Sequence, residues 1–167
     1  MYYKENRKMA KIERKYLAHY INTAANGEAS YERLGKDLEE FSAELSAQVD
    51  TKKNILGETS ILISSYEKTG AVEPYYAESG SGLFERLQAI IDEGQVLDQL
   101  KTDVVEVKLW EAAEEGKFPA IREEAYIEVT SYGGDTTGYQ IPFTLHFTGN
   151  KVKGTFDVST KSFTPAA

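Results

Sequence analysis

Cysteine is absent from this chain of 167 residues, and histidine occurs only twice. The absence of cysteine excludes disulfide bonds, thiolate nucleophiles and metal sites built on sulfur. It is consistent with synthesis in a reducing cytoplasm. His19 and His146 are far apart in the sequence, and neither has a cysteine nearby. We therefore predict two lone surface histidines and no metal site.

The sequence also lacks a long apolar run. A helix that crosses a membrane needs about 20 consecutive apolar residues, and no segment of the chain approaches that length. The N-terminal segment carries Lys4, Arg7, Lys8, Lys11 and Arg14, but no apolar block follows these basic residues. We expect neither a transmembrane helix nor a secretory signal.

Basic residues are scarce relative to acidic ones. The chain has 27 Asp and Glu against 19 Lys and Arg, which gives a formal net charge of −8. Proteins hold nucleic acid through clustered lysine and arginine, so this composition is unfavourable for a nucleic-acid-binding protein. The acidic excess favours solubility. It would also suit a surface past which nucleic acid moves without sticking.

Motifs for catalysis are missing as well. No serine lies in a nucleophile-elbow pattern, and no Ser-His-Asp arrangement is evident. The adjacent pairs Glu39-Glu40, Glu114-Glu115 and Glu123-Glu124 would point to opposite faces of a strand, so they do not form converging catalytic carboxylates. Gly133-Gly134-Asp135 lacks the lysine and the helix of a phosphate-binding loop, and we interpret it as a turn. We predict a protein that is not an enzyme, with no catalytic residue and no cofactor.

The clearest pattern that is present lies in the last third of the chain. From Tyr139 to Phe147 the odd positions are apolar, while the even positions are mostly polar. Strict alternation of this kind predicts a half-buried strand. Gly149-Asn150 follows and predicts a tight hairpin turn. A return strand is then expected over Val152–Val158.

Similar but shorter patterns predict further strands. Alternating or β-branched runs occur at Tyr16–Ile21, Phe41–Ser46, Ser60–Tyr66, Asp103–Trp110 and Ala125–Tyr132. The segment Phe41–Ser46 should have one solvent-exposed face, because Phe41, Ala43 and Leu45 alternate with polar residues.

One segment has the pattern of a helix. Ser81 is a suitable N-cap and Gly94 a suitable C-terminal stop. The apolar residues between them recur at helical spacing and should pack on a sheet; they are Leu83, Phe84, Leu87, Ile90 and Ile91. With about seven strands, one helix and no sustained βαβ alternation, we predict a mainly β (α+β) fold, an antiparallel β-sandwich or barrel with one flanking α-helix.

A projecting element is expected between the two early strands. The connection Asp50–Glu58 has nine residues, whereas hairpin loops usually have about two to five. It is polar at both ends and carries Ile55 and Leu56 in its middle, a pair that would be exposed in an isolated monomer. We therefore expect an N-terminal arm over residues 1–12 and a single domain over 13–167 that carries the projecting loop 50–58.

Five segments of the chain carry a resemblance to a known family. They are Thr51–Thr59, Val72–Tyr76, Val129–Phe143, Phe147–Asn150 and Gly154–Asp157. These segments resemble parts of the major tail tube proteins of bacteriophages and prophages of Gram-positive bacteria. The similarity extends over about residues 12–165 and is clearest beyond Arg33.

The resemblance implies a β-sandwich with a flanking helix, assembled into hexameric rings that stack into a hollow tube of the virion tail. DNA would pass through an acidic lumen during ejection without specific binding, and assembly would take place in the host cytoplasm. Other implied partners are the tape measure protein, the tail terminator and the distal tail or baseplate proteins. The resemblance implies no contact with a membrane. In that family the long early loop reaches a neighbouring subunit or ring, which implies a contact made by Asp50, Thr51, Lys52, Lys53, Asn54, Ile55, Leu56, Gly57 and Glu58.

A second interpretation remains open from the residues alone. The 11 tyrosines and the single tryptophan could supply stacking platforms in a small β-sandwich module that binds a carbohydrate or a protein ligand. Candidate platforms are Tyr75, Tyr76, Trp110, Tyr132 and Tyr139. Tyrosines paired across strands also pack sheets and interfaces, so the same residues fit a structural role.

Overall fold

The computed structural model describes residues 9–167, which form ten strands, one α-helix and two short 3-10 helices. Most of the expected N-terminal arm (1–12) lies outside the described residues, and Met9–Ile12 is exposed and without regular structure. The strands are β1 (Leu17–Asn22), β2 (Tyr31–Arg33), β3 (Ala43–Lys53), β4 (Thr59–Val72), β5 (Lys101–Lys108), β6 (Lys117–Val129), β7 (Gly133–Asp135), β8 (Gly138–Gln140), β9 (Phe143–Asp157) and β10 (Ser162–Pro165). The helices are η1 (Arg14–Tyr16), α1 (Gly82–Glu93) and η2 (Leu97–Leu100).

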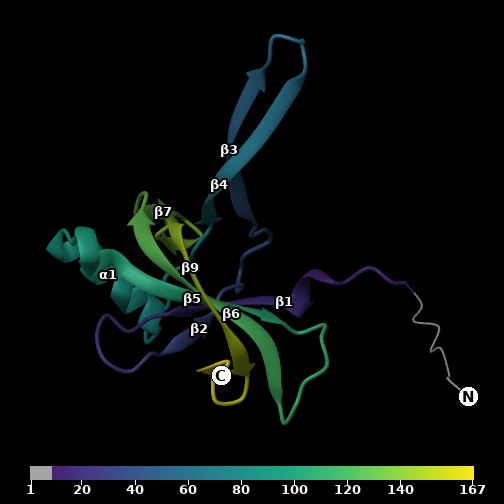
Figure 1. Cartoon of the computed structure of the whole chain (residues 1–167). Coiled ribbons are helices and arrows are strands. Elements are labelled where there is room, and N and C mark those ends of the chain that lie inside the picture. The colour runs from purple at the N-terminus through teal and green to yellow at the C-terminus, as the bar shows by residue number, and fades with distance from the viewer. Residues whose placement is uncertain (1–8) are drawn as a thin grey trace, which may run out of the picture.

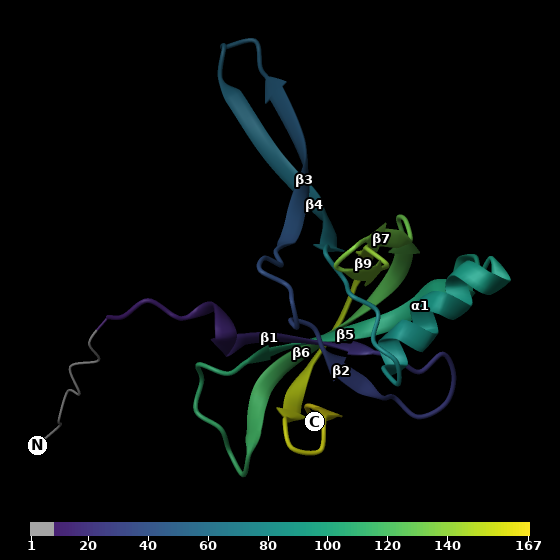
Figure 2. The same ribbon diagram turned by 180° about the vertical axis from the view of Figure 1, so that it is seen from behind.

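The strands are antiparallel throughout the described chain. Eight of them form one sheet in the order β2-β1-β5-β6-β9-β4-β3, with β10 paired to β9, and β7 and β8 form a separate ribbon. The helix α1 lies at one side of this sheet, and the β3–β4 hairpin extends away from the rest of the molecule (Figures 1 and 2). The predicted fold class, mainly antiparallel β with one flanking helix, is confirmed.

The predicted helix is confirmed together with its caps. The Ser81 side chain accepts a hydrogen bond from the Phe84 N–H at 3.4 Å, and Gly94 has the left-handed φ of 60° that ends the helix. A carboxylate from β2 strengthens the N-terminus, because Glu32 accepts hydrogen bonds from the Ser81 hydroxyl and from the Leu83 N–H. The buried residues Leu83, Leu87 and Ile90 of α1 belong to one core cluster. Phe143 and Leu145, alternate residues of β9, are part of the same cluster.

A second core cluster lies where the sheet curls on itself. The rings of Tyr20 (β1) and Phe156 (β9) are 4.4 Å apart between centroids, although β5 and β6 separate these two strands in the sheet. Val104 and Val105 of β5 are both buried, one in each cluster. Neither face of the central strand β5 is exposed to solvent at Val104 and Val105.

The predicted turn at Gly149-Asn150 is wrong, because β9 runs through it as one strand of 15 residues. The pairs Glu123↔Lys151 and Ala125↔Phe147 leave three residues of β9 opposite Glu124, which makes a bulge. Gly149 adopts a φ of 87° there, and its N–H donates to the Glu123 carboxylate at 3.1 Å. A positive φ serves a bulge as well as a turn, so the Gly-Asn signal was ambiguous.

Candidate subunit interface

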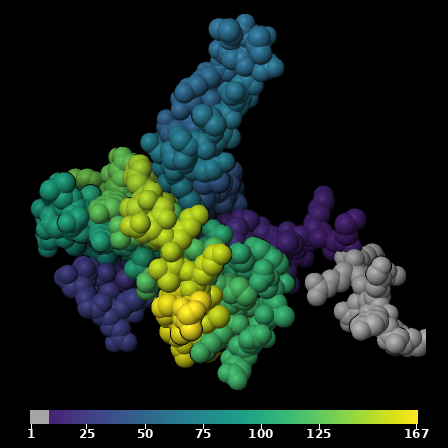
Figure 3. All heavy atoms as spheres, in the orientation of Figure 1, coloured from purple at the N-terminus to yellow at the C-terminus, as the bar shows by residue number. Residues whose placement is uncertain are grey.

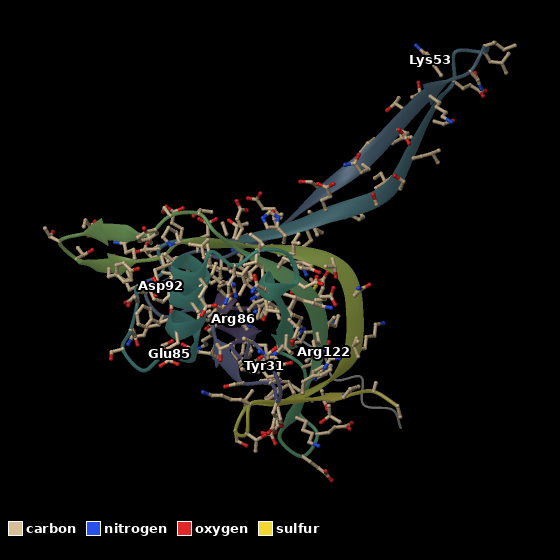
Figure 4. The ribbon with its side chains drawn as sticks, turned by 90° about the vertical axis from the view of Figure 1, so that its left-hand side faces the viewer. Tyr31, Lys53, Glu85, Arg86, Asp92 and Arg122 are labelled. Carbon is tan, nitrogen blue, oxygen red and sulfur yellow. The ribbon has the colours of Figure 1, made fainter. Side chains whose placement is uncertain are left out.

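The β3–β4 hairpin is the part of the molecule with the least contact to the rest. β4 pairs with β9 only over Lys68–Val72, and every residue from 46 to 67 is exposed. The hairpin stands out as a column in the space-filling view, with Lys53 at its far end (Figures 3 and 4). The structure places Asp50–Lys53 in β3 and leaves only residues 54–58 for the connecting turn.

Hydrogen bonds around Asn54 fix the turn at the tip. Its side-chain oxygen accepts from the N–H groups of Leu56 and Glu58 at 2.9 and 3.0 Å, and its amide donates to the Glu58 carboxylate at 2.8 Å. Gly57 has a φ of 80°, which a side chain would strain. Ile55 and Leu56 are almost fully exposed, with relative areas of 103% and 76%. The tip therefore holds an apolar pair in a defined position in solvent.

The strand register divides the hairpin into two unlike faces. Residues that pair across an antiparallel ladder project to the same face, and the pairs include Ala47↔Tyr66 and Val49↔Ile63. The apolar face is formed by Leu45, Ala47, Val49, Ile61, Ile63 and Tyr66, with Lys68 at its base and Thr51, Lys53 and Thr59 toward the tip. The polar face consists of Glu44, Ser46, Gln48, Asp50, Lys52, Ser60, Leu62, Ser65 and Glu67.

A β-bulge creates this division. Gln48 pairs with Ser65 and Val49 pairs with Ile63, so Ser64 has no partner across the ladder. Regular alternation would place Ile63 and Tyr66 on opposite faces, because one is at an odd and the other at an even position. The extra residue shifts the outer half of β4 by one position and brings its isoleucines onto the face of Tyr66.

The apolar face continues the core side of the sheet. At the base of the hairpin Ala43 pairs with Gly70, which pairs with the fully buried Leu145. The Phe41 ring covers this point so closely that a Cβ on Gly70 would lie 2.8 Å from it. Beyond Phe41 nothing in the described chain covers the apolar face. The hairpin therefore exposes apolar side chains that a second layer of structure would normally bury.

The polar face continues the outer side of the sheet across four strands. Glu44 pairs with Thr69, Thr69 with His146, and His146 with Tyr126. The predicted exposure of His146 is confirmed, and its ring lies 2.5 Å from the Glu128 carboxylate. The charged residues on this broad face are mainly acidic; they include Glu44, Asp50, Glu67, Glu124 and Glu128, against Lys52 and Lys101.

A buried ion pair fixes the base of the hairpin to the body. Lys68 of β4 lies 2.8 Å from the carboxylate of Glu123, and Glu123 is only 3% exposed. The Lys68 ammonium also lies over the Phe147 ring, 4.5 Å from its centre. A buried charge that loses its partner destabilises a fold by about 3–5 kcal/mol, so this pair strongly restrains the hairpin base. The sequence showed only that Glu123 and Glu124 point to opposite faces, and that expectation is confirmed.

His19 belongs to the same region and corrects a prediction. It was expected at the surface but is 5% exposed, since β1 turns this residue toward the Phe41 ring and the side chain of Glu106. Its Nε2 lies 3.2 Å from the Glu106 carboxylate. This hydrogen bond lowers the pKa of Glu106 below its usual value, against the opposing effect of burial.

Three further observations concern metal ions, membranes and aromatic binding platforms. Residues 9–167 contain no cluster of three His, Cys, Asp or Glu side chains that could hold a metal ion. No helix in that range has the length and apolar character to span a bilayer. Two of the expected aromatic platforms pack within the molecule: Tyr75 packs edge-on against Phe143, and Tyr139 packs against Phe84.

No family model and no curated protein sequence matches the chain, but its fold matches those of several solved structures. One is the tail tube of SPP1, solved by solid-state NMR and cryo-EM, with a TM-score of 0.58, 19% identity and coverage of 86% of this chain and 78% of that chain. The tail of an empty GTA particle, solved with C6 symmetry, has a TM-score of 0.55, 15% identity and coverage of 92% and 99%. A chain of the sheath/tube terminator of PVC, an extracellular contractile injection system, has a TM-score of 0.54, 12% identity and coverage of 87% and 97%. The chain therefore has the fold of these tail structures.

Proposed function

We propose that this protein is the structural subunit of a tail tube, and that its copies form rings that stack into a hollow conduit for DNA. The observation that carries the proposal is the apolar face of the β3–β4 hairpin, an uncovered continuation of the core on a chain with the tail-tube fold. Fully burying an aliphatic side chain contributes about 1.5–3 kcal/mol, so covering several of them supplies ample energy for association. The occupant is another copy in the same or the adjacent ring.

The assembly has six copies per ring in this proposal, supported by the C6 symmetry of the similar GTA tail. Contact is made by the nine residues of the sequence-based hypothesis, now placed at the end of β3 and in the turn, together with the apolar face. The tube belongs to a virion tail, is assembled in the host cytoplasm, and meets the tape measure, tail terminator and distal tail or baseplate proteins at its ends.

The polar face would line the lumen. It is the face opposite to the one that needs cover, and its charged residues are mainly acidic. Acidic side chains repel DNA phosphates within a Debye length of about 8 Å at physiological salt. DNA can then move along the wall without binding to it.

A matched pair of variants tests the proposal. Ile63 and Leu62 are adjacent, 54% and 55% exposed, and lie on opposite faces of the hairpin. Ile63→Asp places a carboxylate in the interface, where an unpaired buried charge costs at least about 3 kcal/mol, a weakening of association of more than about 100-fold. Leu62→Asp adds the same charge to the polar face.

We expect wild-type protein and Leu62→Asp to form rings or tubes in negative-stain electron microscopy, and Ile63→Asp to stay monomeric. Circular dichroism should show all three folded, because neither residue packs against the body. Wild-type protein that remains monomeric at high concentration, even with its tail partners, would refute the tube. Tubes from Ile63→Asp would refute the role of the apolar face.

A further inference from the structure

A second exposed apolar site lies at the end of the molecule that carries α1. Val96 and Leu97, in the turn between α1 and β5, are 59% and 80% exposed. Leu97 also has a φ of 54°, a left-handed conformation that is unfavourable for a residue with a Cβ. Two unfavourable features therefore coincide at one leucine.

Hydrogen bonds from side chains of the surrounding structure hold this turn in place. Arg86 of α1 is 5% exposed, and its guanidinium donates to the carbonyl oxygens of Gln99 and Lys101 at 3.4 and 2.7 Å. Figure 4 shows Arg86 within the body of the molecule. The Val96 N–H donates to the Gln99 side chain at 3.1 Å. The strained leucine is thus presented by a fixed turn, which is typical of a functional contact.

Acidic side chains flank the two apolar ones. Asp92, Glu93 and Asp98 are all exposed. None of the three takes part in an ion pair within residues 9–167. We call residues 92–98 the acidic knob, since it combines a small apolar centre with carboxylates that lack a cationic partner in the part of the chain described.

A groove of complementary character lies at the other end of the molecule. It has a volume of about 530 Å³ and runs between the start of β1 and the segment 33–41. Its floor is mainly apolar and is formed by Leu17, Leu34, Leu38 and Phe41, together with the buried His19. Its rim is basic and is formed by Arg14, Lys15, Arg33 and Lys36, with Glu39 as an acidic member. We call it the basic groove.

The two arginines of the rim are available for carboxylates. Arg14 donates to the carbonyl oxygens of Leu17 and Phe41 at 2.6 and 3.0 Å, and Arg33 donates to that of Lys15 at 3.0 Å. Within residues 9–167 neither arginine has an acidic partner, whereas the rim lysines have exposed ones. A guanidinium can donate two parallel hydrogen bonds to a carboxylate, so both arginines can bind acidic side chains of another molecule.

The knob and the groove cannot meet within one molecule. The knob precedes Lys101, the first residue of β5, while Leu17 of the groove pairs with Lys108, the last residue of that strand. Eight extended residues separate the two sites by about 25 Å. In Figure 1, α1 lies to the left and the segment that leads into β1 lies to the right.

We propose that the acidic knob of one copy docks into the basic groove of the next copy and so forms the lateral contact within the ring. The inference rests on the proposed function, because it supplies the contact that a ring requires. Complementary patches at opposite ends of a molecule give a head-to-tail interface that closes when the rotation is right. Leu97 fills the apolar centre of the contact, and the charged rim sets partner and register.

The substitution Leu97→Asn isolates the role of the leucine. Asparagine tolerates a positive φ, so the variant should melt at or above the wild-type temperature. Loss of the apolar side chain should lower the yield of sedimentable rings or tubes at least tenfold. Val158→Asn is the control, because it removes another exposed apolar side chain that belongs to neither site, and it should assemble as wild type does.

Engineered cysteine pairs identify the docking partner, because the natural chain has no cysteine. Chains carrying Gln95→Cys are mixed with chains carrying Glu39→Cys, assembled and oxidised. We expect disulfide-linked pairs that contain one chain of each kind. A chain with both substitutions should give a ladder that ends at the number of subunits in the ring. Ile55→Cys mixed with Glu39→Cys tests the hairpin tip as the occupant of the groove instead.

The possible failures are separable. Wild-type rings without a disulfide between positions 95 and 39, cross-linking of position 55 to position 39 instead, or full assembly of Leu97→Asn would each overturn the docking and leave the tube proposal standing. Absence of rings from wild-type protein would overturn the tube proposal itself and this lateral contact with it.

Discussion

Glu123 and Glu124 show how far the position of one residue decides its role. The first is buried with Lys68 and the Gly149 N–H, and the second is paired with Lys101 at the surface. Alternation in a strand predicts that the two differ. It cannot predict which one faces inward, because that depends on Lys68 and Gly149, which arrive from β4 and β9. The buried His19 was missed for the same reason, since Glu106 is 87 residues away.

The His19–Glu106 contact predicts a pH-dependent contribution to stability. The pKa of Glu106 lies below its usual value of 4.5 in the folded protein. Its stabilisation is therefore fully present above pH 4.5 and is lost as the pH falls through the lowered pKa. Glu106→Gln should reduce the free energy of unfolding by about 1 kcal/mol at pH 7.

Urea unfolding at pH 7 and at about pH 3 checks this prediction. The gap between wild type and Glu106→Gln should narrow as the pH falls through the lowered pKa of Glu106, because protonation makes the glutamate side chain neutral like that of glutamine. Glu128→Gln is a suitable control, because its carboxylate pairs with an exposed histidine and surface pairs contribute little. A gap of unchanged size at the lower pH would contradict the assignment.

At the scale of elements, the β3–β4 hairpin separates what sequence patterns reveal from what they do not. Helix α1 and its caps could be predicted because local residues decide them. The strand residues Asp50–Lys53 could not, since they are exposed on both faces and the alternation that marks a half-buried strand is lost. They are extended because they pair with Thr59–Leu62. The two faces depend further on the unpaired Ser64, which has no distinctive signal in the sequence.

The bulge gives a prediction at this scale. Insertion of one alanine between Gln48 and Val49 supplies a partner for Ser64 and makes the ladder regular. The outer half of the hairpin then rotates, so that Asp50 and Leu62 replace Val49 and Ile63 on the apolar side. We expect a folded monomer, judged by circular dichroism, that forms no tubes in electron microscopy.

Deletion of Ser64 is the matched control for that insertion. It also removes the bulge, but the pairs Gln48↔Ser65 and Val49↔Ile63 keep their faces. Tubes should therefore form. If the insertion assembles as well as the deletion does, the division into two faces has no part in assembly.

For the whole molecule, the structure predicts that folding and assembly can be separated. Residues 46 to 67 are all exposed, while Lys68 and its ion pair belong to the body. Replacement of 46–67 by Asn-Gly would join Leu45 to Lys68 through a two-residue hairpin turn. The free energy of unfolding should change by less than about 1 kcal/mol.

Thermal unfolding and sedimentation check this prediction together. The shortened chain should melt within a few degrees of wild type and should form no tubes at concentrations at which wild type forms them. A shortened chain that is unfolded would show that the hairpin belongs to the core after all. One that still forms tubes would show that the remaining surfaces are enough for assembly.

The unpaired Ser64 has a consequence for how such a chain can change over time. If the proposed tube forms, selection for a well-folded monomer acts little on the exposed outer hairpin, and substitutions there are selected through their effect on assembly. An insertion or deletion that shifts one strand by a single residue relative to the other, usually tolerated in an exposed segment, would here replace the apolar surface with a polar one. The outer hairpin should therefore vary in residue identity on its polar face as long as that face stays acidic, and it should keep the strand register that sets its two faces.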